Sequence, residues 1–226
     1  MKTLRQPGTF SYDTGMKRRQ FLGYVAATAS AATIISACNK NDDSSSNGGI
    51  DLGSGDVGIL NYAYALEQLE AAFYIQVIAT PYDEIIDDEL SLLRDIRDHE
   101  IAHREFLKAA LGTSAIPALG VDFSTINFSS RDSVLAIAKT FEDLGVSAYN
   151  GAGQLLTSTD NLLIAGKIVS VEARHAAYIS DLISGGSFVD TANSDGLDVV
   201  DTPANVLMAA APFLTSKLDA SHLPTN

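Results

Sequence analysis

Two halves of the chain carry the same chemically active residue types in the same order. The first half contains Glu67, Tyr74, Glu100 and His103, and the second contains Glu142, Tyr149, Glu172 and His175. In each half six residues separate the first Glu from the Tyr, and a Glu-x-x-His motif follows about two dozen residues later. Carboxylate oxygens and imidazole nitrogens are common ligands of divalent transition metals. The doubled pattern therefore indicates a site for two metal ions.

The spacing within each half suits a helix. Glu and His three residues apart lie on one helical face, about 4.5 Å apart along the axis, so both can reach one cation. A Glu on a neighbouring helix can then bridge to that cation. The seven-residue step to the Tyr is nearly two turns, and helical side chains lean toward the N-terminus. Tyr74 and Tyr149 are therefore expected to point back and hydrogen-bond the carboxylates.

The elements that position these residues are predicted to be four helices. Apolar residues recur at spacings of three and four over about residues 56–79, 83–111, 130–157 and 159–184. Every member of the doubled pattern lies on a core-facing stripe. Short turns near Pro81 and Ser158 join neighbouring helices, whereas residues 112–129 are long enough to cross the bundle. This all-α arrangement, two helical hairpins joined by one long crossover, resembles the ferritin-like four-helix bundle.

Charge supports the metal interpretation. Burying an ion costs several kcal/mol, and the net stability of a domain is only about 5–15 kcal/mol, so four uncompensated core carboxylates would threaten the fold. Two divalent cations balance four Glu side chains. The same constellation holds two iron or two manganese ions in the ferritin-like dimetal proteins that this pattern resembles, so the resemblance implies two ions of iron or of manganese.

Comparison of the two halves selects among neighbouring candidates. Glu142 is the counterpart of Glu67, whereas Gly145 is the counterpart of Glu70. Glu67 is therefore the expected ligand, and Glu70 is either an auxiliary ligand or a residue beside the site. His99 points about 100° around the helix from the adjacent motif, which predicts a surface or interface position.

The two Glu-x-x-His motifs, with the stretch Gly-Val-Ser-Ala-Tyr-Asn-Gly-Ala at residues 145–152, resemble the ferritin-like superfamily. The resemblance covers about residues 56–184 and is to bacterial ferritin-like domain proteins with export leaders, relatives of plant desiccation-associated proteins. The second Glu-x-x-His is nearer to rubrerythrins and manganese catalases than to ferritins. The resemblance implies six metal ligands: Glu67, Glu100, His103, Glu142, Glu172 and His175. Tyr74 and Tyr149, placed beside these ligands by their spacing, are the catalytic candidates.

Three functions remain open for such a centre. The first is an oxidoreductase of peroxidase, catalase or ferroxidase type that acts on oxygen, peroxide or ferrous iron. The second is a non-catalytic metal-binding or stress-protection protein. This alternative gains weight because the single cysteine, Cys38, leaves no Cys pair for a rubredoxin-type iron that could donate electrons. The third, a bundle without metal, is disfavoured because all six ligand positions are intact.

The N-terminal region resembles an export leader. Residues 17–23, Lys-Arg-Arg-Gln-Phe-Leu-Gly, precede an Ala-rich apolar stretch that ends in Ile-Ser-Ala-Cys at Cys38. Residues 1–37 are thus expected to be a twin-arginine lipoprotein signal peptide, with Cys38 lipidated and the protein anchored to a membrane at the cell envelope. A short membrane anchor is the alternative, although the apolar run falls below the roughly 18 residues needed to span. Met16 is an alternative start to Met1.

The rest of the chain is predicted to comprise a polar flexible tether, the bundle and an acidic tail. The tether covers residues 38–55, the bundle residues 56–184, and the tail residues 185–226, with a short helix over 204–217 after a Thr202-Pro203 start. The part from Cys38 onward carries 10 basic and 27 acidic residues. Such a surface repels phosphate backbones and disfavours nucleic-acid binding. The oligomeric state is left open.

Overall fold

The computed structural model describes residues 48–190 and 192–225. The expected leader, Cys38 and most of the expected tether lie outside these residues. Within the described part, no helix combines the length and apolar character needed to span a membrane.

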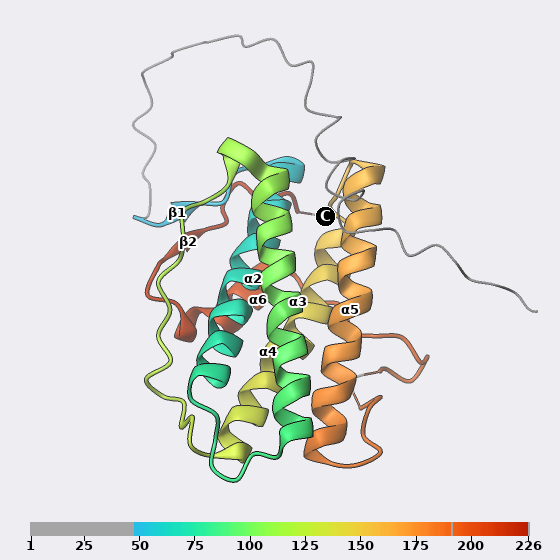
Figure 1. Cartoon of the computed structure of the whole chain (residues 1–226). Coiled ribbons are helices and arrows are strands. Elements are labelled where there is room, and N and C mark those ends of the chain that lie inside the picture. The colour runs from blue at the N-terminus through green and yellow to red at the C-terminus, as the bar shows by residue number, and fades with distance from the viewer. Residues whose placement is uncertain (1–47, 191, 226) are drawn as a thin grey trace, which may run out of the picture. The chain divides into compact units, whose positions relative to one another are not determined.

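Four long helices form two antiparallel pairs: α2 (Gly55–Ala79), α3 (Asp87–Leu111), α4 (Arg131–Gly153) and α5 (Thr159–Ile183). Helix α2 packs along α3, and α4 packs along α5 (Figure 1). The connection from α3 to α4 opens with the short 3-10 helix η1 (Gly112–Ser114) and runs the length of the bundle (Figure 1). The predicted all-α fold of two hairpins and one long crossover is confirmed.

The first hairpin connection is longer than predicted, because α3 begins at Asp87 rather than near residue 83. Glu84 adopts a left-handed backbone conformation, with φ of 61°, which helices exclude. The buried Tyr82 donates a hydrogen bond to Glu89 in the first turn of α3, and Arg131 donates to the same carboxylate at 2.9 Å. These contacts fix the connection against the start of α4.

The second hairpin connection is also longer, because α4 ends at Gly153 rather than near residue 157. Asp56 at the start of α2 accepts hydrogen bonds from Thr157 N at 2.8 Å, Ser158 N at 2.9 Å and Asn161 Nδ2 at 2.9 Å. These bonds hold residues 154–158 as a turn, and Ser158 caps α5 by accepting from Asn161 N.

The predicted C-terminal helix begins where expected and ends early. Thr202 caps α6 (Pro203–Ala210) by accepting from Asn205 N, and the 3-10 helix η2 (Ala211–Phe213) follows. The chain then leaves the helical conformation instead of continuing to residue 217.

A two-stranded parallel sheet ties the two ends of the domain together. Strand β1 (Ile50–Asp51) pairs with β2 (Leu218–Asp219). Leu52, directly after β1, is fully buried. The packed domain therefore begins near residue 50 rather than at 56, so the last part of the expected tether belongs to the fold.

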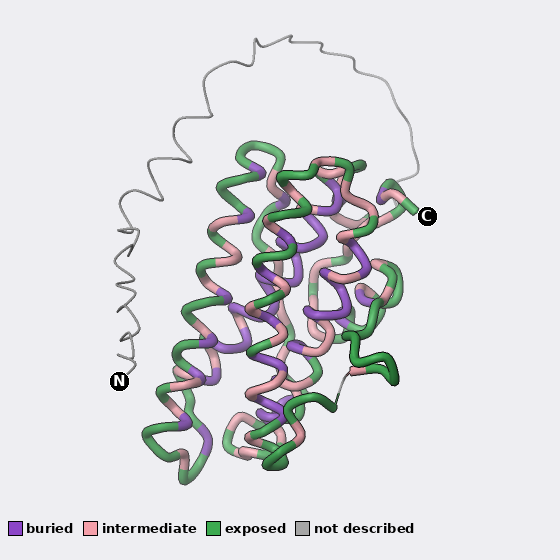
Figure 2. The backbone as a smooth tube through the Cα atoms, turned by 90° about the vertical axis from the view of Figure 1, so that its right-hand side faces the viewer, coloured by how far each residue is buried: buried purple, intermediate pink, exposed green. Residues whose placement is uncertain are grey.

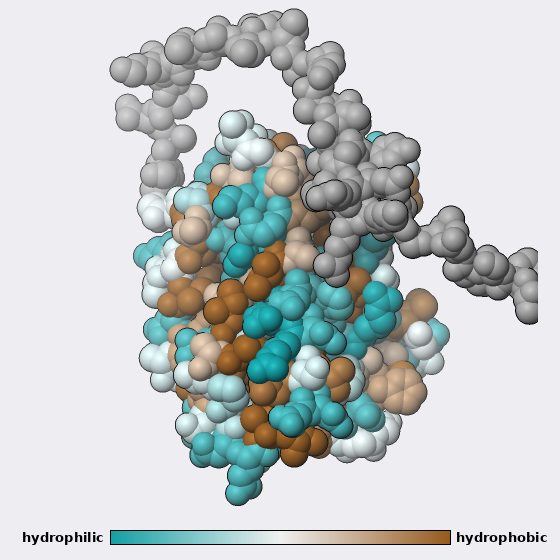
Figure 3. Space-filling view, viewed as in Figure 1, coloured by the Kyte–Doolittle hydropathy of each residue, from teal (hydrophilic) through white to brown (hydrophobic). Residues whose placement is uncertain are grey.

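Helix α2 is the most enclosed of the four. Figure 2 shows that buried positions line the inner sides of the helices, and on α2 sixteen residues are buried. Its outer side is covered because Asn61 donates to Leu52 O at 3.1 Å and Ser114 O at 2.9 Å and accepts from Ile116 N at 3.0 Å. The face of the bundle that carries α3, shown in Figure 3, is mainly hydrophilic along that helix, with smaller hydrophobic groups beside the helix.

Candidate metal centre

The six expected ligands meet in the middle of the bundle as two overlapping groups. One group is Glu67, Glu100, His103 and Glu172, and the other is Glu100, Glu142, Glu172 and His175. In each group one ligand atom per residue lies within 4.8 Å of all the others. Glu100 and Glu172 belong to both groups. The arrangement is therefore two overlapping groups that share two carboxylates, and each group could hold a cation.

The two imidazoles face the centre in equivalent ways. His103 Nδ1 lies 2.8 Å from Glu172 Oε1 and 3.5 Å from Glu67 Oε2. His175 Nδ1 lies 2.8 Å from Glu100 Oε1 and 3.4 Å from Glu142 Oε2. Each Nδ1 atom thus approaches the shared Glu of the opposite hairpin. The doubling seen in the sequence is a two-fold relation in space.

Each tyrosine crosses from its own hairpin to the other. Tyr74 on α2 donates a hydrogen bond to Glu142 Oε1 on α4 at 2.5 Å, and Tyr149 on α4 donates to Glu67 Oε1 on α2 at 2.5 Å. The expected hydrogen bonds are therefore present. They hold one oxygen of each unshared Glu and leave the other directed toward the centre.

Eight ligand atoms of the cluster are buried and have no hydrogen-bond partner among the described residues. These atoms are Glu67 Oε2, Glu142 Oε2, both carboxylate oxygens of Glu100 and Glu172, and Nδ1 of His103 and His175. The 2.8 Å contacts of the imidazoles are close enough for ion pairs but do not have hydrogen-bond geometry. A buried polar atom without a partner costs about 1–3 kcal/mol. Two cations would satisfy all eight atoms, so the donor set fits a dimetal centre.

Burial and the neighbouring charges shift the pKa values of the residues in this cluster. Burial, followed by the charge of Glu172, raises the pKa of Glu67, and the same causes raise the pKa of Glu100 well above its ordinary value. Burial alone would lower the pKa of His103 and His175, but the surrounding carboxylates raise each pKa to about 12. Protonated imidazoles would offset part of the negative charge of the four carboxylates. Bound cations would displace these protons.

Glu70 lies beside the cluster rather than within it. It is buried, yet it belongs to neither group of converging ligand atoms. Its space exists because the facing residue is Gly145, where an added Cβ would lie 3.1 Å from Glu70 Oε1. Burial and then the charges of Glu100 and Glu172 raise the pKa of Glu70 well above its ordinary value. The sequence left Glu70 as either an auxiliary ligand or a residue beside the site, and the structure favours a residue beside the site.

His99 makes a contact that its position in the sequence did not reveal. It is exposed, as expected for a surface residue. Its ring nevertheless stacks on His175 at a centroid distance of 5.2 Å, with Nδ1 2.9 Å from His175 Nε2. A hydrogen bond at the outer nitrogen fixes which ring nitrogen faces the centre. Val171 occupies the equivalent position on α5, so only one half has this support.

A family model described as a ferritin-like domain matches residues 55–185. The matched segment contains all four long helices and all six candidate ligands. No curated protein in the comparison matches the chain.

Proposed function

The chain belongs to the ferritin-like domain family, and from this premise we propose that it is a dimetal carboxylate oxidoreductase. Its centre would hold two iron or two manganese ions and act on oxygen, peroxide or ferrous iron. The observation that supports this most strongly is the set of eight buried ligand atoms without partners. Hard carboxylate oxygens around two adjacent positions suit ions that change oxidation state.

The shared carboxylates and the imidazoles would hold the two ions. Glu100 and Glu172 would hold the two ions at a fixed separation, because each belongs to both ligand groups. His103 and His175 would each bind one ion through Nδ1. When bound, the two ions supply two one-electron steps, so that the pair can transfer two electrons to oxygen or peroxide.

Tyrosines and a buried acid would support this chemistry. Tyr74 and Tyr149 restrain the unshared carboxylates through their hydroxyl groups and are the candidates for a catalytic role. Glu70 is buried beside the cluster, opposite Gly145, and would be the acid of this chain best placed to exchange protons with the site. Reduction of oxygen to hydrogen peroxide consumes two protons with its two electrons, and an acid beside the site would relay them.

A non-catalytic metal-binding or stress-protection protein is the second candidate. It is favoured by the single cysteine, which leaves the chain without a Cys-pair electron donor of its own. Metal analysis of the purified domain, followed by oxygen and peroxide consumption after loading with ferrous iron or manganese, separates the two. Two ions with turnover support the oxidoreductase, two ions without turnover support the binding protein, and no bound ion refutes both.

We also propose that the protein works at the cell envelope. The support is the twin-arginine pattern at residues 17–23 and the lipoprotein pattern that ends at Cys38. Lipid attachment at Cys38 would hold the domain at a membrane. In cell fractionation, the protein should sediment with membranes, whereas the Cys38→Ala variant should not. Equal membrane association of both would refute the anchor.

A further inference from the structure

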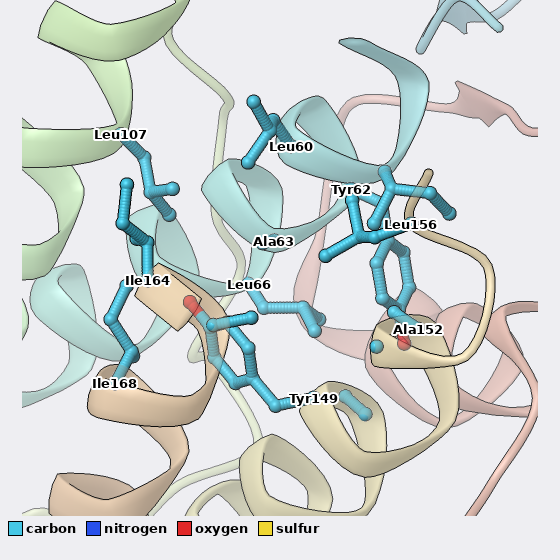
Figure 4. A pocket seen from close by; sticks show the side chains of 14 residues that line it. Leu60, Tyr62, Ala63, Leu66, Leu107, Tyr149, Ala152, Leu156, Ile164 and Ile168 are labelled. Carbon is cyan, nitrogen blue, oxygen red and sulfur yellow. The ribbon is translucent and has the colours of Figure 1, made fainter. Parts of the chain in front are cut away.

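A small apolar cavity lies next to the metal centre, toward the end of the bundle where α2 begins. It has about 20 Å³ of space for the centre of a water-sized molecule, enough for one small molecule. In Figure 4 the side chains of Leu66, Leu107, Ile164 and Tyr149 point toward this common space. All four long helices contribute to the walls. The walls of the cavity are therefore formed mainly by the same elements that carry the ligands.

The cavity borders the ligands directly along the chain. Leu66 precedes Glu67, Leu107 follows His103 by one turn, and Ile168 precedes Glu172 by one turn. Tyr149 lines the cavity and donates its hydroxyl hydrogen to Glu67. Tyr149 is therefore the wall between the cavity and one metal position.

At the opposite end of the bundle, larger side chains occupy the positions that correspond to the cavity walls. In the doubled pattern Tyr74 is the counterpart of Tyr149, and the residue before it is Phe73, where the cavity end has Ala148. Phe73 packs edge-on against Tyr74 at 5.1 Å and against Phe141 at 5.2 Å between ring centroids. Aromatic rings thus fill the space over the second tyrosine.

Three further pairs differ in the same direction. Where the cavity end has smaller side chains, the filled end has larger ones: Leu66 against Phe141, Ala152 against Val77, and Ala165 against Leu93. All of these residues are buried. The cavity therefore lies where these side chains are smaller, and the equivalent positions at the other end carry larger ones.

The cavity walls restrict what can occupy it. A water or peroxide molecule needs several hydrogen-bond partners, and the walls are apolar apart from the hydroxyls of Tyr149 and Tyr62. The Tyr149 hydroxyl is already engaged with Glu67, and the Tyr62 hydroxyl is buried without a partner among the described residues. An ion would lose several kcal/mol on entering. A small neutral apolar molecule pays no such cost.

We propose that this cavity binds dioxygen beside the metal pair and that it opens to solvent past Leu60, Leu156 and Ile164. These three rim residues are half-buried, whereas the residues nearer Tyr149 are buried. The proposal rests on the proposed function, because it names dioxygen as the substrate that this centre receives. It also assigns the two ends different roles: entry at the Tyr149 end and closure at the Tyr74 end.

Xenon tests the cavity without any metal, since dry apolar cavities bind it. Crystals of the metal-free protein under xenon pressure should show one xenon atom between Leu66, Leu107 and Tyr149. Ala148→Phe, which copies Phe73, and the milder Ala165→Leu, which copies Leu93, should each lose that site. Leu93→Ala at the filled end should keep it. Absence of xenon from the unaltered protein, or its persistence in both filled variants, would overturn the proposal.

The second measurement follows oxidation of ferrous iron in the loaded protein. The filled variants should still bind two ions but react with dioxygen on the order of tenfold more slowly, because the substrate is no longer held beside the reacting groups. Unchanged rates in folded variants would overturn the proposal. A centre that reacts with peroxide and not with dioxygen would also overturn it, yet leave the oxidoreductase function standing. Failure to bind metal would refute that function, while the xenon result still decides the cavity.

Discussion

Substitution of one shared ligand and one unshared ligand should have graded effects on metal-dependent stability. Glu100 belongs to both ligand groups, whereas Glu142 belongs to only one. Glu100→Gln should therefore damage both cation positions. Glu142→Gln should leave the position formed by Glu67, Glu100, His103 and Glu172 intact.

The expected size follows from linkage. At a free metal concentration about 100 times the dissociation constant, each bound ion stabilises the fold by about 2.7 kcal/mol, so two ions contribute about 5 kcal/mol. For a chain of this size, that is a rise in Tm of about 10–20 °C between the metal-free and loaded forms. Glu142→Gln should keep about half of the rise, and Glu100→Gln should keep almost none.

Calorimetry of metal-free and metal-loaded samples, with metal counted in the same samples, measures these shifts. Glu89→Gln is the matched control, because Glu89 is also buried but bonds to Tyr82 and Arg131 outside the cluster. That variant should have a lower Tm in both forms and keep the full metal-dependent rise. Equal rises in the Glu100→Gln variant and the control would refute the assignment of Glu100 as a shared ligand.

Four further results are expected. Tyr74→Phe should retain two metal ions but bind them about tenfold to a hundredfold more weakly, because Glu142 Oε1 loses its hydrogen bond. Competition with a chelator measures this affinity, and an unchanged affinity would contradict the prediction. The pKa of His103 and His175 is raised to about 12 in the metal-free protein, so the stability that their protonation provides is complete below pH 6.5 and is lost as pH rises toward 12. The free energy of unfolding, measured in urea, should therefore fall by up to about 1.4 kcal/mol per pH unit per imidazole. A free energy of unfolding that increases between pH 7 and pH 9 would contradict this. Hydrogen bonds lower the pKa of Asp56, and the largest contribution comes from Thr157 N, so the stability that Asp56 provides is present above pH 4 and is lost in acid. Asp56→Ala should therefore lower Tm at pH 7 and have little effect near pH 1.5. An equal change in Tm at both pH values would contradict this. Leu52→Ala should destabilise the domain by about 2–5 kcal/mol in urea unfolding, and a loss below 1 kcal/mol would mean that β1 is not part of the fold.

The sequence predicted the four helices and the converging residues because both depend on local periodicity. Apolar residues and ligands recur together on one face of each helix, so the stripes place Glu67 and Glu142 in the core without knowledge of the partner helix. Burial confirms both placements. The comparison of halves also separated Glu67 from Glu70, because Gly145 leaves the second half without a counterpart to Glu70.

What the sequence missed depends on contacts between distant segments. Strand β1 is only two residues long and pairs with β2 more than 160 residues later, so no local sequence pattern predicts this strand. The early end of α4 follows from the bonds of Asp56 to Thr157 and Ser158, across the bundle end. The contact of His99 with His175 joins two helices whose relative rotation no single stripe specifies.

Metal content of the purified domain tests the central claim most directly. The eight unpartnered ligand atoms predict two ions per chain after loading with ferrous iron or manganese. Anomalous diffraction from such crystals should show two peaks, one between Glu67 and His103 and one between Glu142 and His175, with Glu100 and Glu172 contacting both. A single peak, or none in a correctly folded and fully loaded sample, would contradict the dimetal centre.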